Sequence, residues 1–158
     1  ELGTSPEQGS FALTVFFSIG IFMTYIGGLL GDKYGPIKII RLSLLIWLPS
    51  MFLLTQVPQF SGTIIMPLAY LILLMIGAAK AISYSPVIVL GQTYLAKSIG
   101  FASGITLGVS QTIGGVIAPV VGNLADTYSL SLAMLTLVPF LIVGLGASLL
   151  LKDPKKLQ

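Results

Sequence analysis

The chain has 158 residues, of which 55% are hydrophobic and only 8% are charged, and its mean hydropathy is +1.01. Soluble domains carry about 25% charged residues, so this composition excludes a soluble globular domain and indicates a membrane protein. The sequence contains no cysteine and no histidine, which excludes disulfides and sites built on thiolate or imidazole groups. The charges that give the net +3 are scattered, so we expect no nucleic-acid partner, and we expect no cofactor or metal.

Five apolar segments are long enough to cross a bilayer, whose hydrocarbon core needs about 20 residues of helix. Breaks rich in Gly, Pro, Ser, Asn or charge separate them. The sequence therefore predicts an all-α membrane protein with five transmembrane helices. The predicted spans are 10–30, 39–57, 64–90, 100–122 and 130–151, with a tail at 152–158.

The basic residues predict how these spans are oriented. With five spans, seven of the eight basic residues fall on one side, and the other side carries only the acids Glu1, Glu7 and Asp126; the seven are Lys33, Lys38, Arg41, Lys97, Lys152, Lys155 and Lys156. Loops rich in Lys and Arg stay in the cytoplasm. We therefore expect a multi-pass protein of the inner (plasma) membrane, with Glu1 and Gln59 outside and the C-terminus in the cytoplasm.

The stretch "GGLLGDKYGPIK", residues 27–38, lies between the first two spans. Its residues alone are equally consistent with a tight hairpin whose charges anchor in water. The stretch also resembles the signature G-x-L-x-D-[RK]-x-G of the major facilitator superfamily, with Gly28, Leu30, Asp32, Lys33 and Gly35 at the matched positions. The resemblance implies a cytoplasmic gate. Pro36 departs from the signature where the family prefers a base, which Lys38 or Arg41 would replace.

A second resemblance covers the stretch from Gln92 to Asp126. It is similar to the closing helices of the fosmidomycin-resistance family of bacterial efflux proteins, and the residues that carry it are Gln92, Ile99, Gly100, Ala102, Ser103, Gly104, Leu107, Gly108, Gly114, Gly115, Gly122, Ala125 and Asp126. Together the two resemblances imply helices eight to twelve of a twelve-helix fold. Residues 1–158 would then be an incomplete C-terminal bundle of the major facilitator fold, lacking its N-terminal bundle.

Small residues recur along the fourth span at helical spacing: Gly104, Gly108, Gln111, Gly115, Pro119 and Gly122. Such a stripe lets another helix approach closely, which serves either static packing or a helix that slides during transport. "GGVIAPVVGN" partly resembles the glycine-proline motif of drug antiporters, although Ala118 and Asn123 replace glycines there. The first span has a similar stripe at Gly20, Thr24, Gly27 and Gly31.

Lys80 is the one charge well inside a predicted span, where a lysine is unfavourable by about 2.5–3.5 kcal/mol. Ser83 and Tyr84 follow at i+3 and i+4, on the same face. Lys80 either contacts an anionic substrate or a carboxylate elsewhere, or it extends to the inner surface as a structural residue. Gln92 and Gln111 are further candidates for the substrate pathway, although Gln92 is also consistent with a side chain in water.

These features predict a secondary active transporter that exports a drug or small metabolite by alternating access, with fosmidomycin-like compounds as one candidate. An uptake carrier of the same fold and a non-transporting membrane scaffold remain as alternatives. An enzyme is not expected, because no nucleophile with a base is present. No acid lies deep in a span, so proton coupling would use a group in the N-terminal bundle. The expected partners are the lipid bilayer, that bundle and a small-molecule substrate.

Overall fold

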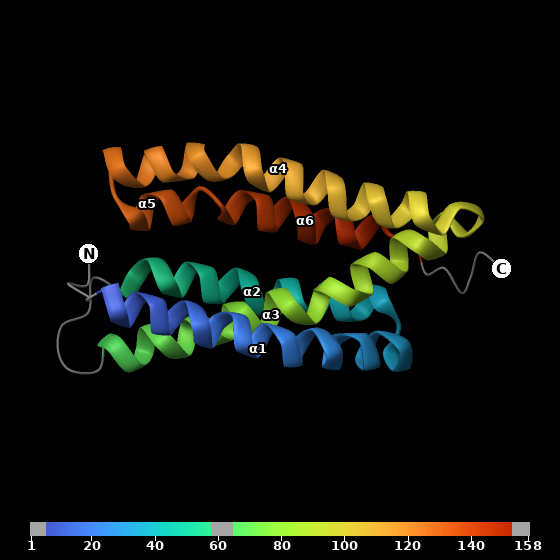
Figure 1. Ribbon diagram of the computed structural model, residues 1–158, viewed down its shortest axis with the longest axis horizontal. Coiled ribbons are helices and arrows are strands. Elements are labelled where there is room, and N and C mark those ends of the chain that lie inside the picture. The colour runs from blue at the N-terminus through green and yellow to red at the C-terminus, as the bar shows by residue number, and fades with distance from the viewer. Residues whose placement is uncertain (1–5, 58–64, 153–158) are drawn as a thin grey trace.

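The computed structural model describes residues 6–57 and 65–152, and these residues form helices in two layers (Figure 1). One layer contains α1 (Pro6–Tyr34), α2 (Pro36–Gln56) and α3 (Ile65–Tyr94). The other contains α4 (Ile99–Thr127), α5 (Leu130–Leu135) and α6 (Val138–Leu150), and the short helix η2 (Ala96–Ser98) links the two. Within these described residues, five helical stretches are long and apolar enough to cross a membrane, as the sequence predicted.

The central element is α3, which packs most extensively against α1 and α2 and also touches α4. Its buried apolar residues share a core with α2, and side chains of α1, α5 and α6 cover it; the core residues are Met51, Val57, Ala69, Ile72 and Ile76. A smaller cluster of Ile37, Ile40 and Leu90 packs α2 against α3 near the opposite end. These two clusters join α1, α2, α3, α5 and α6, whereas α4 contacts α3 and α5 outside them.

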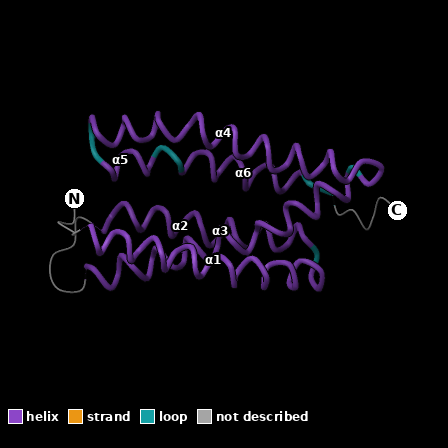
Figure 2. The backbone as a smooth tube through the Cα atoms, viewed as in Figure 1, coloured by secondary structure: helices purple, strands orange, loops and turns teal. Residues whose placement is uncertain are grey.

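The fifth predicted span differs from a single helix. A turn at Thr136 and Leu137 divides residues 130–151 into α5 and α6, and Figure 2 shows this loop within the upper layer. Pro139 has no N–H, so it cannot donate to the carbonyl one helical turn earlier. Just before it, the Leu137 N–H donates to the Met134 carbonyl at 3.1 Å, three residues back, which is a tighter turn than an α-helix makes.

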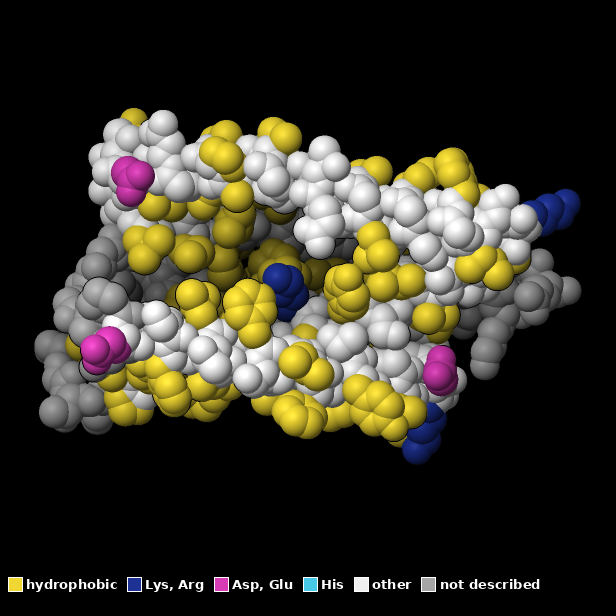
Figure 3. Space-filling view, in the orientation of Figure 1, with side chains coloured by type: hydrophobic (Ala, Val, Ile, Leu, Met, Phe, Trp, Pro, Cys, Tyr) yellow, Lys and Arg dark blue, Asp and Glu magenta, His cyan; other side chains and the backbone are white. Residues whose placement is uncertain are grey.

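The outward surface is strongly apolar. Within α4 only Ala102 is buried, and large hydrophobic side chains are exposed along α1 and α4. The described basic residues other than Lys80 lie where α1 meets α2, where α3 meets α4 and after α6, which is one end of the bundle. Figure 3 shows basic side chains at this end and one more in a hollow at mid-length.

Candidate functional site

The signature residues lie at the end of α1 and in the link to α2. Gly35 has a φ of 94°, a left-handed conformation that glycine adopts without strain, and Pro36 starts α2 directly after it. Gly28 lies against α3, where an added Cβ would be 3.2 Å from the Ser85 hydroxyl oxygen. Both glycines therefore have a local reason to be glycine.

The charged members of the signature face outward. Asp32 is exposed and, within the described part of the chain, makes neither a hydrogen bond nor an ion pair. The Lys33 ammonium lies 5.2 Å from the centre of the Tyr34 ring, at cation–π distance. The Asp32 carboxylate is thus available to a partner outside the residues described.

The small-residue stripe of the first span forms a close contact between α1 and α3, here called the α1–α3 contact. A Cβ added at Gly27 would overlap the Ile82 carbonyl oxygen and lie 2.7 Å from the Ile82 carbonyl carbon. A Cβ at Gly31 would lie 3.2 Å from Pro86, whereas one at Gly20 would lie 4.0 Å from Ala81. The two backbones are therefore closest at Gly27 and farther apart at Gly20.

Lys80 lies in a groove between α1 and α3, here called the Lys80 groove. Its volume is about 260 Å³, and its lining residues are Phe16, Phe17, Gly20, Ile21, Thr24, Gly77, Lys80, Ala81 and Tyr84. The Lys80 ammonium lies 5.8 Å from the centre of the Phe16 ring. Lys80 is exposed, and the described residues supply no ion pair to it. It is residue 16 of the 30 in α3, so it lies near the middle of that helix.

The other predicted pathway residues fall into two groups. Tyr84 lines the same groove as Lys80 and is 48% exposed. Ser83 does not line the groove, and its hydroxyl donates to the Lys80 carbonyl at 2.9 Å.

Gln92 lies 12 residues beyond Lys80, about 18 Å along the helix, and its amide donates to the Ser103 hydroxyl at 2.8 Å. Gln111 is exposed on α4, which does not touch α1. The groove therefore contains Lys80 and Tyr84, whereas Ser83, Gln92 and Gln111 lie outside it.

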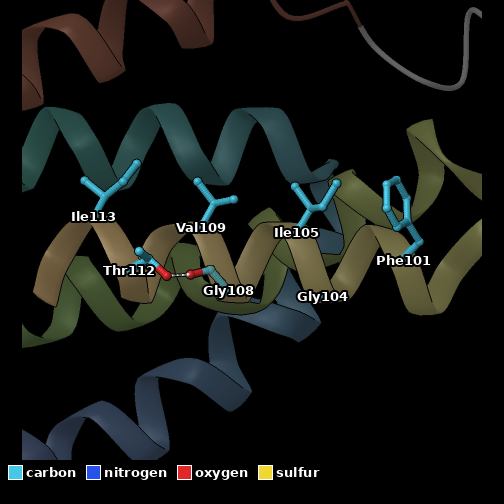
Figure 4. Close-up of a pocket in the computed structure, with 7 residues that line it drawn as sticks. All are labelled: Phe101, Gly104, Ile105, Gly108, Val109, Thr112 and Ile113. Atoms are coloured by element: carbon cyan, nitrogen blue, oxygen red, sulfur yellow. Dashed lines mark hydrogen bonds between the residues drawn. The ribbon is translucent and has the colours of Figure 1, made fainter. Parts of the chain in front are cut away.

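The α4 stripe, Gly104, Gly108, Gly115, Pro119 and Gly122, has no packing partner among the described residues. A Cβ added at any of its four glycines would meet open space. Figure 4 shows Phe101, Ile105, Val109 and Ile113 along one side of α4, beside a shallow hollow formed by α4 alone. The role of this stripe in helix packing stays a prediction.

Two contacts at the basic end were not found from the sequence. The Arg41 guanidinium donates to the Ser148 carbonyl at 2.8 and 3.1 Å and reaches the Leu149 carbonyl at 3.4 Å. Tyr94 Oη donates to the Lys152 carbonyl at 2.6 Å. The last carbonyls of a helix have no partner within the helix, so Arg41 satisfies acceptors at the end of α6. The available signal was an arginine inside the apolar run 39–48.

The fold and this site define a multi-pass helical membrane protein with a largely apolar groove that holds one lysine near the middle of a helix. The chain belongs to the Major Facilitator Superfamily, whose sequence model matches residues 1–158. It is similar to the uncharacterized MFS-type transporter YfnC of Bacillus subtilis (strain 168), with 32% identity over 151 residues that cover 96% of this chain and 35% of YfnC.

A second relative is the fosmidomycin resistance protein of Escherichia coli (strain K12). It is 31% identical over 137 residues, which cover 84% of this chain and 31% of that protein. The chain thus spans about a third of the length of the curated relatives it matches. No solved structure matches the chain.

Proposed function

We propose that this chain is part of a secondary active transporter that exports a drug or small metabolite by alternating access. Secondary transporters bind substrate near the bilayer midplane, between two bundles that move against each other. The observation that carries the proposal is Lys80, a cation at the middle of α3 that faces a groove and has no ion-pair partner in the described residues. Ionisable side chains at this depth usually belong to a substrate or ion pathway.

An anionic substrate fits this groove best. The described acids are Glu7, Asp32 and Asp126, and each lies within a few residues of a helix end. A substrate anion would balance the positive charge of Lys80. Fosmidomycin-like phosphonates are one candidate, because one relative is a fosmidomycin resistance protein.

The proposal includes parts of the protein beyond this chain. The remaining two thirds of the relatives' length would hold the N-terminal bundle, which would face this one across the substrate pathway. Proton coupling would use a carboxylate in that bundle. The basic end of the helices would face the cytoplasm of a plasma membrane, and Asp32 with the other signature residues would form a gate at that end.

The test is transport by the full-length protein, the Lys80→Ala variant and the Lys80→Arg variant at matched membrane levels. Lys80→Ala should reduce transport of an anionic substrate about tenfold or more, the loss expected when a hydrogen bond between charged groups, about 1.5–3 kcal/mol, is removed. Lys80→Arg should retain part of it, because it keeps the charge but changes its shape. A neutral substrate should be affected less by either change. Wild-type rates for anions in Lys80→Ala would show that the lysine is structural.

The direction of transport is tested separately. Cells that make the protein should be protected from an exported toxic substrate, whereas an uptake carrier of the same fold would sensitise them. A non-transporting scaffold would change neither, and it would tolerate substitutions of Lys80 and Asp32.

A further inference from the structure

The lining of the Lys80 groove combines one cation with aromatic and aliphatic surface. Phe16, Phe17 and Ile21 of α1 and Tyr84 of α3 contribute most of the side-chain bulk. Phe17 and Ile21 are 63% and 74% exposed, so their apolar surface is free to contact a ligand. A groove for a compact, fully hydrated anion would instead present several polar donors.

Few hydrogen-bond donors are free in the groove. The Thr24 hydroxyl donates to the Gly20 carbonyl at 2.8 Å, so its proton is already used. This leaves the Lys80 ammonium and the Tyr84 hydroxyl, for which no hydrogen bond occurs among the described residues. The two side chains are four residues apart on α3 and so lie on the same face of the helix. The groove carries a single positive charge, which balances a monoanion such as a carboxylate better than a phosphonate dianion.

The position of Lys80 along α3 bears on whether a soluble anion or a lipid headgroup would be its ligand. Lys80 is 15 residues from Ile65 and 14 from Tyr94, the two ends of α3. At 1.5 Å per residue this is about 22 Å from the first end and about 21 Å from the second. Lipid headgroups lie outside the hydrocarbon core, which is about 30 Å thick. With α3 centred in the bilayer, headgroups would lie about 15 Å from the level of Lys80, so a soluble ligand in the transport pathway would reach this lysine more readily than a headgroup.

We propose that the Lys80 groove binds a small organic anion with an aromatic body. The anionic group would contact the Lys80 ammonium and the Tyr84 hydroxyl, and the aromatic body would lie against Phe16 and Phe17. The volume of about 260 Å³ is just below the 300–1,000 Å³ of pockets for drug-sized molecules, which favours a small ligand. This inference rests on the proposed transport function and narrows its substrate class.

The test measures binding of three probes to the full-length protein in nanodiscs of zwitterionic lipid. Phenylacetate has the anion and the ring, acetate has only the anion, and 2-phenylethanol has only the ring. Phenylacetate should bind at least about tenfold more tightly than either, because contact with an aromatic body adds about 1.5 kcal/mol or more. Lys80→Met should weaken phenylacetate binding about tenfold, whereas Lys97→Met, at an exposed lysine far from the groove, should not change it.

Two further variants keep the test decisive if Lys80→Met does not fold. Tyr84→Phe keeps the ring and removes one donor, and it should weaken phenylacetate binding severalfold with little effect on 2-phenylethanol. Phe16→Leu should reduce the preference for phenylacetate over acetate.

The outcomes separate this inference from the proposed function. Equal, Lys80-dependent affinity for acetate and phenylacetate would overturn the aromatic-anion class and leave an anion transporter. The inference would also be overturned if phenylacetate did not bind, or if substitutions of Lys80 and Tyr84 left its affinity unchanged. Transport by the wild-type protein, measured independently, would decide whether the proposed function survives.

Discussion

Replacing Gly27 with alanine tests whether α1 and α3 are held by direct backbone contact. The added Cβ would lie 2.7 Å from the Ile82 carbonyl carbon and 2.8 Å from its Cα, and it would overlap the carbonyl oxygen. Ordinary van der Waals contact begins near 3.4 Å, so the two helices would have to separate by about 0.7 Å or more. The atoms in the way belong to the backbone, so a change of side-chain rotamer cannot relieve the overlap.

Gly20→Ala is the matched control on the same face of the same helix. Its Cβ would lie 4.0 Å from the Ala81 Cβ, at ordinary contact distance. Both substitutions gain the same helix propensity, about 1 kcal/mol, so the difference between the two variants isolates the overlap. Overpacking of this kind usually destabilises by about 1–3 kcal/mol.

The assay is thermal unfolding of the full-length protein in detergent, followed by circular dichroism. For a folding unit of 150–250 residues, about 2–4 °C of melting temperature corresponds to 1 kcal/mol. Gly27→Ala should therefore melt about 2–12 °C below Gly20→Ala. Equal melting temperatures for the two variants would refute the close α1–α3 contact at Gly27.

Three further predictions concern the ends of the bundle. A single cysteine at position 38 should react only from the cytoplasm, and one at position 126 should react only from outside. This chain has no native cysteine, so it adds no background labelling. Labelling of both positions from one side would contradict the five-span topology. Asp32→Asn should lower transport more than it lowers the amount of folded protein, and equal losses of both would indicate a structural role. Arg41→Met should speed amide hydrogen exchange in residues 145–152 about tenfold to hundredfold, because hydrogen bonds of a charged group contribute about 1.5–3 kcal/mol. Lys38→Met is the control. Identical exchange rates in the two variants would contradict the role of Arg41.

Composition and spacing predicted the number of membrane-spanning segments because membrane length and backbone hydrogen bonding leave few alternatives. They did not predict the break between α5 and α6. Hydropathy treats Pro139 as one residue in an apolar run and takes no account of its missing N–H.

Spacing alone also could not tell the two small-residue stripes apart. Gly27 and Gly104 belong to stripes of similar period, yet a Cβ at Gly27 meets the backbone of α3 and a Cβ at Gly104 meets nothing in the described residues. Which stripe packs depends on where the other helices lie, and that is a property of the whole arrangement. The same holds for Gln92, whose partner Ser103 comes close only because α3 and α4 meet at a short link.

The contact between Arg41 and Ser148 has a consequence for how the chain is made. The two residues are 107 positions apart, and Ser148 lies near the end of α6. At about 5–20 residues per second, a ribosome makes Ser148 roughly 5–20 seconds after Arg41. During that interval the guanidinium has to be satisfied by water or by lipid headgroups at the basic end. The contact at the basic end of the bundle therefore forms as a late step, after α6 has entered the membrane.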